Sequence, residues 1–331
     1  MADFAAKRDE RSLQGGQPVK PSKKNMMRGR ADSVDRRGFL KAMASTVAAL
    51  SLPVLSKDAG AFSWDEFFQK HFYELSREEL EKRIKRLEKE YNEKFHRTDF
   101  SVSTDGPLKD VRFAYALSLS KCIGCRKCVH ACVAENNQHR GSESRRDVVE
   151  YIRVLEMEKG SLDLEKAVHD YSHPVPAEGK YYMPVQCHHC NNAPCTKVCP
   201  VEATWQEVDG IVVVDYEWCI GCRYCQAACP YFARRFNFSE PRLPEAEVNP
   251  VTHYLGNRPR SKGVMEKCTF CIQRTRRGLN PACLDVCPTG SRKFGNLLDP
   301  DSEIRYIINN KRVFILKEEL GTMSSFYYYF D

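Results

Sequence analysis

The amino-acid sequence predicts an α+β fold in which two cysteine-rich units form one compact domain behind an N-terminal helical extension. Two observations lead to this prediction. All sixteen cysteines fall into four groups of four, and short runs of alternating apolar residues precede the groups, as strands would. The chain therefore divides into residues 1–61, residues 62–110 and a cysteine-rich domain over residues 111–331.

The four cysteine groups have spacings typical of ligands for 4Fe–4S clusters. In chain order they are Cys122, Cys125, Cys128 and Cys132; Cys187, Cys190, Cys195 and Cys199; Cys219, Cys222, Cys225 and Cys229; and Cys268, Cys271, Cys283 and Cys287. The first and third groups follow C-x2-C-x2-C-x3-C, the bacterial run for such clusters. The second widens the middle gap and the fourth widens it further. Four complete groups predict four 4Fe–4S clusters, which form a path for single electrons.

The spacing within each group indicates how the thiolates are shared. Three closely spaced cysteines can surround one face of a cluster, and we expect the fourth to begin a helix and to bind the neighbouring cluster of a pair. Pro200, Pro230 and Pro288 follow the fourth cysteine of groups two, three and four, where proline stops a helix. Group one has Val133 at that place.

This exchange of the fourth cysteine gives a definite hypothesis for four ligand sets. They are Cys187, Cys190 and Cys195 with Cys229; Cys219, Cys222 and Cys225 with Cys199; Cys122, Cys125 and Cys128 with Cys287; and Cys268, Cys271 and Cys283 with Cys132. Only residues 200–218 separate groups two and three, so residues 187–199 and 219–229 form an inner unit. Residues 122–132 and 268–287 form the outer unit when the two ends of the domain meet.

Zinc is the competing metal, because CxxC pairs also bind structural zinc. The fourth group alone could form a zinc site, whereas the evenly spaced third cysteine of groups one and three has no role at zinc. His188 and His189 lie inside the second group and could be ligands of the Rieske type. Since that group already has four cysteines, we expect both histidines to pack beside the cluster.

Apolar patterns predict the strands that carry these groups. Val111 to Leu119 alternates and leads into the first group, and Tyr181 to Val185 precedes the second. Between groups two and three, Asp209-Gly210 marks a hairpin turn. This strand-then-cysteine order is that of a ferredoxin-type βαβ unit. We also expect a strand over 312–316, a packed end segment over 326–330, and surface loops over 240–263 and 290–300.

The segment before the cysteine-rich domain has a helical pattern. Ser63-x-x-Glu66 and Ser76-x-x-Glu79 both fit the capping box. Behind the second box, one apolar stripe is formed by Leu80, Ile84, Leu87 and Tyr91. Two interpretations stay open: the helix packs on its own domain, or it docks a partner subunit.

Residues 1–61 resemble a twin-arginine signal peptide. Residues 35–41 match the Arg-Arg-x-Phe-Leu-Lys pattern, with Asp35 where serine or threonine is commoner. An apolar stretch over 42–55 is too short to span a bilayer, and 59–61 offer a small-residue cleavage site. We therefore expect a periplasmic protein that folds around its clusters before export; the alternative is a disordered basic tail. Nothing after residue 61 is apolar enough over a sufficient length to cross a membrane.

Charge argues against a nucleic-acid partner. The chain has a formal charge of +7, but residues 1–61 account for +6, so the rest is nearly neutral before clusters add negative charge. Several cations sit among the cysteines and could raise cluster potentials, or be ordinary surface charges. They are Lys121, Arg126, Lys127, Arg223, Arg234, Arg235 and Lys267.

Residues 110–331 resemble the iron–sulfur subunits of the complex iron–sulfur molybdoenzyme family, which includes dimethyl sulfoxide, polysulfide and tetrathionate reductases. The resemblance rests on Cys-Ile-Gly-Cys-Arg at 122–126 and 219–223, Cys-Pro-Tyr-Phe-Ala-Arg-Arg-Phe at 229–236, Lys-Cys-Thr-Phe-Cys at 267–271 and Leu-Lys-Glu-Glu-Leu-Gly-Thr at 316–322. It implies two ferredoxin-like units with four clusters. It also implies a molybdopterin-type catalytic subunit or a multihaem cytochrome as partner, together with a quinone-reactive membrane subunit.

The sequence thus predicts an electron-transfer subunit rather than an enzyme in its own right. No Ser/His/Asp set, nucleotide-binding loop or spare cysteine is present, so no catalytic residue is assigned. One alternative is a structural or redox-sensing iron–sulfur protein without sustained electron turnover. Another is a self-contained reductase, for which the sequence offers no open metal site or flavin motif.

Overall fold

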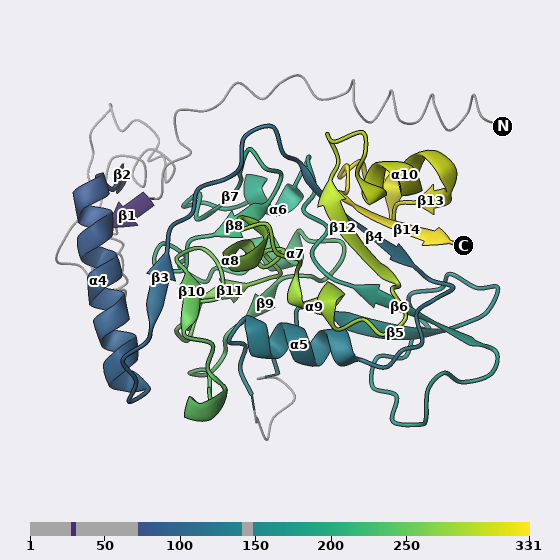
Figure 1. Cartoon of the computed structure of the whole chain (residues 1–331), viewed down its shortest axis with the longest axis horizontal. Helices are drawn as coiled ribbons and strands as arrows, with labels where there is room; N and C mark the ends of the chain where they lie inside the picture. Colours follow the sequence, from purple (N-terminus) through teal and green to yellow (C-terminus); the bar gives the residue numbers. More distant parts are fainter. Residues whose placement is uncertain (1–27, 31–71, 141–147) are drawn as a thin grey trace, which may run out of the picture.

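The computed structural model describes residues 28–30, 72–140 and 148–331. The twin-arginine motif, the cleavage site and the Ser63 capping box lie outside the described residues. In Figure 1 the long helix α4 stands at one edge and a four-stranded sheet at the other, with the cysteine-bearing segments between them. The fold mixes short helices with small sheets, in agreement with the predicted α+β class.

The largest sheet has the strand order β12-β4-β14-β13. Its strands are β4 (Phe113–Ser118), β12 (Arg292–Asn296), β13 (Arg312–Phe314) and β14 (Phe326–Phe330). β12 is antiparallel to β4, whereas β14 runs parallel to β4 and antiparallel to β13. The predicted strand before the first cysteine group is therefore confirmed. The end segment is a strand, and 290–300 includes β12 rather than only a surface loop.

Both faces of β4 are buried. Tyr115 and Leu117 point into the main core, and Ala114 and Ala116 pack on the other side against helix α10 (Glu303–Asn310). Small alanine side chains allow that helix to approach the sheet closely. The alternation in this strand therefore separates large from small buried residues, not buried from solvent-exposed ones.

Two-stranded sheets lead into the other cysteine groups. β5 (Arg153–Glu158) pairs with β6 (Lys180–Val185), and β7 (Thr204–Gln206) pairs with β8 (Val212–Val214). The predicted strand before the second group and the predicted hairpin are both confirmed. Gly210 supplies the positive φ of the hairpin turn, +84°. A further pair joins β9 (Arg235–Phe236) to β11 (Met265–Glu266).

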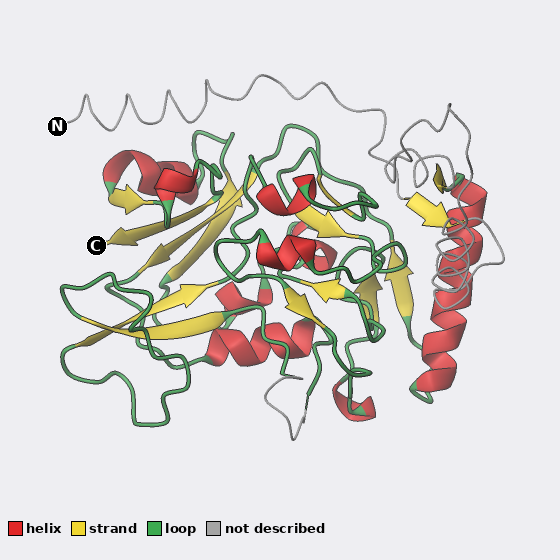
Figure 2. Ribbon diagram, turned by 180° about the vertical axis from the view of Figure 1, so that it is seen from behind, coloured by secondary structure: helices red, strands yellow, loops and turns green. Residues whose placement is uncertain are grey.

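Short helices carry the third cysteine of each group. Figure 2 shows these helices between the sheets. They are α5 (Lys127–Glu135), α6 (Pro194–Lys197), α7 (Tyr224–Ala227) and α9 (Ala282–Asp285), with α8 (Ile272–Thr275) between the two halves of group four. The expectation that the fourth cysteine begins a helix was wrong, because the third cysteine stands in the first turn and the fourth comes later. Helix α5 alone continues past the fourth cysteine, where Val133 replaces the proline of the other groups.

The N-terminal extension contains strands as well as a helix. Helix α4 (Arg77–Lys94) begins at the predicted Ser76–Glu79 capping box. β3 (Ser101–Ser103) pairs in parallel with β10 (Val251–His253), and β2 (Phe72–Glu74) pairs with β1 (Arg28–Arg30).

Helix α4 packs on its own domain through the predicted stripe. Leu87 and Tyr91 are buried, and the Tyr91 hydroxyl donates to the carbonyl of Pro259 at 3.2 Å. At the end of the helix, Phe95 stacks on Phe100. The structure thus accounts for the stripe within the chain, while the opposite side of the helix is charged and exposed.

The prediction of a surface loop over residues 240–263 was wrong in its second half. Tyr254 and Leu255 are fully buried, and the 3-10 turn η1 (Glu245–Glu247) is followed by β10. Polar side chains misled the prediction, because Arg258 and Arg260 are buried in ion pairs with Glu217 and Glu266. A second 3-10 turn, η2 (Glu318–Leu320), precedes β14. No helix in the described ranges is both long and apolar enough to cross a membrane.

Candidate iron–sulfur sites

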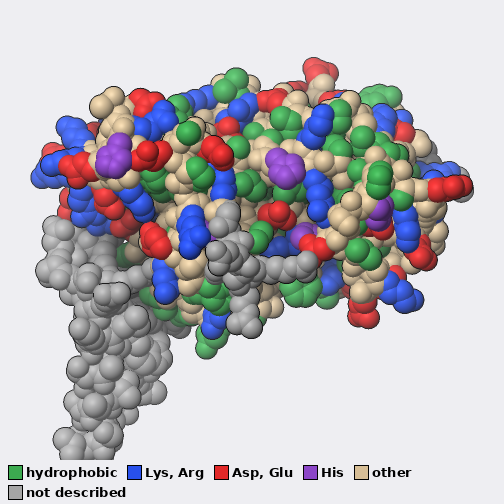
Figure 3. Space-filling model, turned by 90° about the horizontal axis from the view of Figure 1, so that it is seen from below, with side chains coloured by type: hydrophobic (Ala, Val, Ile, Leu, Met, Phe, Trp, Pro, Cys, Tyr) green, Lys and Arg blue, Asp and Glu red, His purple; other side chains and the backbone are tan. Residues whose placement is uncertain are grey.

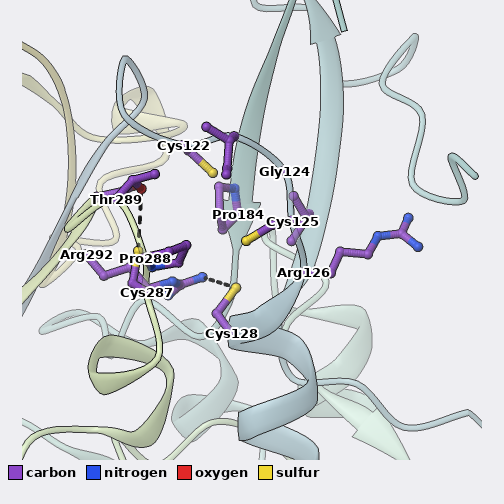
Figure 4. A pocket seen from close by; sticks show the side chains of 13 residues that line it. Cys122, Gly124, Cys125, Arg126, Cys128, Pro184, Cys287, Pro288, Thr289 and Arg292 are labelled. Atoms are coloured by element: carbon purple, nitrogen blue, oxygen red, sulfur yellow. Dashed lines mark hydrogen bonds between the residues drawn. The ribbon is translucent and has the colours of Figure 1, made fainter. Parts of the chain in front are cut away.

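The first cysteine group forms a pocket together with a distant cysteine. Cys122, Cys125 and Cys128 line it with Cys287, the last member of group four. In Figure 4 the four sulfur atoms point into one hollow between the start of α5 and the turn after α9. The structure therefore brings together the residues that the crossed hypothesis grouped, although Cys128 and Cys287 are far apart in the sequence.

The second group forms a similar pocket. Cys187, Cys190 and Cys195 line it with Cys229, the last cysteine of group three. Cys195 comes from α6 and Cys229 from the turn after α7, and these two helices pack on each other. Again the fourth position is filled from another group.

The third set places Cys132 beside group four. The side-chain amide of Asn136 lies 3.6 Å from both the Cys132 and the Cys271 sulfur, and Gln138 donates to Cys132 at 3.2 Å. Burial raises the pKa of the Cys132 thiol well above its usual value, and the neighbouring Cys268, Cys271 and Cys283 add to the rise. Cys132 thus lies one helical turn beyond Cys128 on α5 but faces a different set of thiols.

The fourth set joins Cys199 to group three. Burial raises the pKa of Cys199, with a further contribution from Cys219. Burial raises the pKa of Cys225 to about 11, and both Cys219 and Cys199 add to that rise. The first three sets therefore combine three cysteines of one group with the last cysteine of another, and Cys199 lies beside Cys219 and Cys225 of group three in the same way.

Exposure and neighbourhood place the four sets in a row. Cys222 is the exposed cysteine, Cys122, Cys125, Cys199 and Cys287 are half-buried, and the others are buried. Arg292 contacts both Cys128 and Cys283, so the sets of these two cysteines are neighbours. Besides burial, the nearby Cys187 raises the pKa of Cys268, which makes the sets of these two cysteines neighbours as well. Cys195 likewise raises the pKa of Cys225 and so joins the last set to the row. When each set is named after its first cysteine in the lists above, the order is the Cys122 set, the Cys268 set, the Cys187 set and the Cys219 set. The more exposed thiols therefore lie at the two ends of the row.

The donor chemistry of these sites fits 4Fe–4S clusters. Every cysteine is a free thiol, and burying several thiols around one hollow is favourable when metal ions take the thiolate charge. Among the described residues no three His, Cys, Asp or Glu side chains converge on one ion; the thiols surround hollows instead. Buried Arg234 also has a nitrogen, Nη1, without a hydrogen-bond partner in the described part of the chain, and a cluster sulfide is a suitable acceptor for it.

The cations singled out in the sequence behave differently from one another. Arg234 is buried and donates from Nη2 to the Cys195 sulfur at 3.0 Å. Lys267 is buried and donates to the carbonyl of Cys268 at 2.7 Å. Arg126 stacks on the Tyr171 ring at 4.1 Å, and Arg223 lies over the Phe236 ring at 5.3 Å.

The remaining three of these cations lie toward the surface. Lys121 forms an ion pair with Asp331 at 2.7 Å, and Arg235 donates to the carbonyl of Glu150 at 3.0 Å. Lys127 is exposed. Burial beside the cysteines, with a contact to the Cys195 sulfur for Arg234 and to the Cys268 carbonyl for Lys267, therefore separates these two from the ordinary surface charges.

Sequence reasoning missed Arg292. Its guanidinium is buried and donates to the Cys128 sulfur at 3.3 Å, as the dashed line in Figure 4 shows. No motif signals this residue, because it reaches Cys128 only through the pairing of β12 with β4. Asn136 and Gln138 were missed as well, because they reach Cys132 only through the extra length of α5.

Packing accounts for both histidines of the second group. His188 stacks on Tyr231 at 3.8 Å between ring centroids, and His189 lies 3.7 Å from the Phe270 ring. The His189 Nδ1 accepts from the backbone of Val212. Burial lowers the pKa of His188 to about 3 and lowers that of His189 as well, so both rings are neutral at physiological pH.

Comparison with known proteins agrees with this arrangement. Two family models described as 4Fe-4S dicluster domains match the chain, one over residues 121–203 and the other over 179–243 and 252–297. Two such domains and sixteen cysteines fit four 4Fe–4S clusters. The fold and the sites therefore define an iron–sulfur protein of the electron-transfer class.

Individual relatives place it more closely. A putative dimethyl sulfoxide reductase iron-sulfur subunit from Halobacterium salinarum is 42% identical over 65% of this chain and 78% of its own length. An iron-sulfur subunit of an Hdr-like menaquinol oxidoreductase from Archaeoglobus fulgidus is 36% identical over 70% and 88%. A thiosulfate reductase electron transfer subunit from Salmonella typhi is 36% identical over 62% and 86%. The chain belongs to this family of iron–sulfur subunits, which transfer electrons within oxidoreductase complexes and are not their catalytic subunits.

Proposed function

We propose that the protein is the exported electron-transfer subunit of a membrane-associated respiratory oxidoreductase. It relays single electrons between a quinone-linked membrane subunit and a catalytic subunit of the molybdopterin type or a multihaem cytochrome. The observation that carries this proposal is the row of four thiol sets with its more exposed members at both ends. A cluster in each set supplies a site that gains and loses one electron.

The proposed ligands are the four crossed sets. One cluster of the outer unit is held by Cys122, Cys125, Cys128 and Cys287, and the other by Cys268, Cys271, Cys283 and Cys132. The inner unit uses Cys187, Cys190, Cys195 and Cys229 for one cluster and Cys219, Cys222, Cys225 and Cys199 for the other. The two lined pockets support the first set of each unit, and this division supports two ferredoxin-like units in one domain.

The surface gives support for a protein partner over a nucleic acid. On the face seen in Figure 3, Lys and Arg side chains are interspersed with Asp and Glu side chains. A nucleic-acid interface would instead gather positive charge along one face. A row of clusters that reaches the surface at two places also suits two protein partners, one that delivers electrons and one that receives them.

The experiment that tests the relay is metal analysis with a redox titration. Anaerobic iron, sulfide and zinc determination on the native protein should give about sixteen iron atoms and no zinc. EPR spectra during stepwise reduction should show several interacting signals at distinct potentials. Twelve iron atoms and one zinc would make the fourth cysteine group structural and shorten the relay.

The same preparation separates a relay from a sensor. A relay keeps all its clusters through repeated reduction and reoxidation and accepts electrons when its membrane partner is supplied with a quinol. A structural or sensing protein would lose a cluster or change its oligomeric state in the first cycles. Turnover of a substrate by the isolated subunit would contradict the proposal in another way, because it would reveal a catalytic site of its own.

Export rests on the arginine pair in the leader. Replacing Arg36 and Arg37 by lysine should retain the cluster-loaded protein in the cytoplasm, since the twin-arginine route carries folded cargo. Cell fractionation with an antibody against the protein measures this directly. A protein that still reaches the periplasm after both replacements would remove the twin-arginine assignment and leave the electron-transfer proposal intact.

A further inference from the structure

The five arginines that are buried in the described part of the chain fall into two classes by the charge that they face. Arg258 pairs with Glu217 at 3.2 Å, Arg260 pairs with Glu266 at 2.7 Å, and Arg276 pairs with Glu207 and Asp209. Arg234 and Arg292 have no carboxylate partner within the described part of the chain and contact cysteine sulfur instead. A buried guanidinium needs a negative partner, so the partner of these two arginines is the charge carried at the thiols.

Arg292 contacts two neighbouring sets at once. Its Nη2 donates to the Cys128 sulfur at 3.3 Å, and its Nη1 lies 3.9 Å from the Cys283 sulfur. Cys128 belongs to the set that includes Cys122, and Cys283 belongs to the set that includes Cys268. The guanidinium therefore stands between two adjacent clusters rather than beside one.

The position of Arg292 is fixed from several sides. Nη1 also donates to the Gln186 Oε1 at 3.0 Å and to the Tyr115 hydroxyl at 3.2 Å. Both partners are neutral, so they orient the guanidinium without neutralising it. Its charge is permanent over the physiological pH range.

Arg234 has a similar place further along the row. Its Nη2 donates to the Cys195 sulfur at 3.0 Å and to the Thr204 hydroxyl at 2.8 Å. Its Nη1 is buried and has no hydrogen-bond partner among the described residues. The charge again faces thiols of the row and no carboxylate.

We propose that Arg292 is a bridging counter-charge that raises the reduction potentials of both clusters that it separates, and that Arg234 acts in the same way on the Cys187 set. This inference rests on the proposed cluster relay. Each reduction adds one electron and one negative charge to a cluster, with no proton required. A cation between two clusters stabilises the reduced state of each and weakens the repulsion that the first electron exerts on the second.

The test is an anaerobic EPR redox titration of the native protein and of R292Q, with each signal assigned from variants that lack one cluster. In R292Q the potentials of the Cys122-set and Cys268-set clusters should both shift downward, while those of the Cys187 and Cys219 sets stay where they are. R234Q should lower the potential of the Cys187-set cluster and leave the potentials of the Cys122-set and Cys268-set clusters unchanged. R292K keeps the positive charge and should therefore bring both potentials most of the way back to their native values.

Arg126 provides a matched control. It lines the same pocket as Arg292, but its guanidinium stacks on Tyr171 and turns away from the sulfur atoms in Figure 4. R126Q removes the same charge from the rim of the pocket and should shift the Cys122-set potential much less than R292Q does, and leave the Cys268-set potential where it is. A shift in R126Q equal to that in R292Q would overturn the proposal, because it would make general surface charge the cause.

Other outcomes are also decisive. Unchanged potentials in R292Q, or a shift of only one cluster, would overturn the bridging role. Loss of iron from both R292Q and R234Q would show that the arginines are needed for cluster insertion, and this result would also overturn the proposed effect on the potentials. A native protein with fewer than four clusters would instead contradict the proposed relay, so the two failures are distinguishable.

Discussion

At the scale of single residues, the two Cys-Ile-Gly-Cys-Arg motifs adopt the same local backbone. Gly124 and Gly221 both have φ of +74°, and the arginines that follow, Arg126 and Arg223, are left-handed N-caps of α5 and α7. This path turns three cysteines toward one hollow within a few residues. Glycine is needed because a side chain there would be strained and would have no room.

Gly221→Ala tests this requirement. A Cβ at Gly221 would overlap the carbonyl oxygen of Gly263, so the third cysteine group cannot keep its path. We expect the purified variant to lose the cluster of the Cys219 set, measured as about four fewer iron atoms per chain.

Gly278→Ala is the matched control for that substitution. Gly278 has a similar φ of +78° but open space around its Cα. Alanine at this position adds only the cost of a left-handed backbone conformation, about 1–2 kcal/mol. The Gly278→Ala protein should therefore retain all the iron. Equal iron content in the two variants would show that the contact with Gly263 does not constrain the motif.

At the scale of elements, the helices that carry the third cysteine of each group differ in length. In three groups a proline ends the helix after one turn, whereas Val133 lets α5 run on to Glu135. That extra turn brings Asn136 and Gln138 to the sulfur of Cys132. A single position in the sequence therefore gives the first group hydrogen-bond donors from the residues that directly follow its helix.

The sequence was sufficient for features that local spacing determines. Groups of cysteines, the prolines behind them, the Ser76 cap and the Asp209-Gly210 turn all act within a few residues, and the structure contains each of these elements. The grouping of thiols across sets was also predictable, since the exchange follows from the geometry of paired cluster-binding loops. Ligation by the sixteen cysteines stays a prediction that iron analysis tests.

Features that depend on long-range pairing were not predictable. Arg292 reaches Cys128 because β12 and β4 are neighbours in the sheet, which no local pattern indicates. The segment around Arg258 and Arg260 looks like a polar loop, and only distant Glu217 and Glu266 make its burial favourable. Burial of charge depends on partners that the sequence does not place side by side.

At the scale of the whole molecule, the row of sets explains why sixteen cysteines share one domain. The crossed fourth cysteines tie group one to group four and group two to group three, so the ends of the domain meet around the clusters. Cys222 at one end is exposed, and Cys122, Cys125 and Cys287 at the other are half-buried. Every cysteine of the two sets in the middle of the row, the Cys268 set and the Cys187 set, is buried. Electrons can therefore enter and leave at opposite ends without contact between solvent and the middle of the row.

This order makes a prediction about magnetic coupling, because reduced clusters are paramagnetic and interact with their neighbours. Cys283→Ala should remove the Cys268-set cluster, the second in the row, and iron analysis verifies the loss of about four iron atoms. The Cys122-set signal should then become sharp and uncoupled in the fully reduced protein, while the Cys187 and Cys219 sets still broaden each other. Cys222→Ala at the exposed end should leave the other three clusters coupled. A Cys122-set signal that stays coupled in Cys283→Ala would require a different neighbour for that cluster. The linear order would then be replaced by a compact arrangement, in which removal of one inner cluster no longer interrupts electron transfer between the two ends.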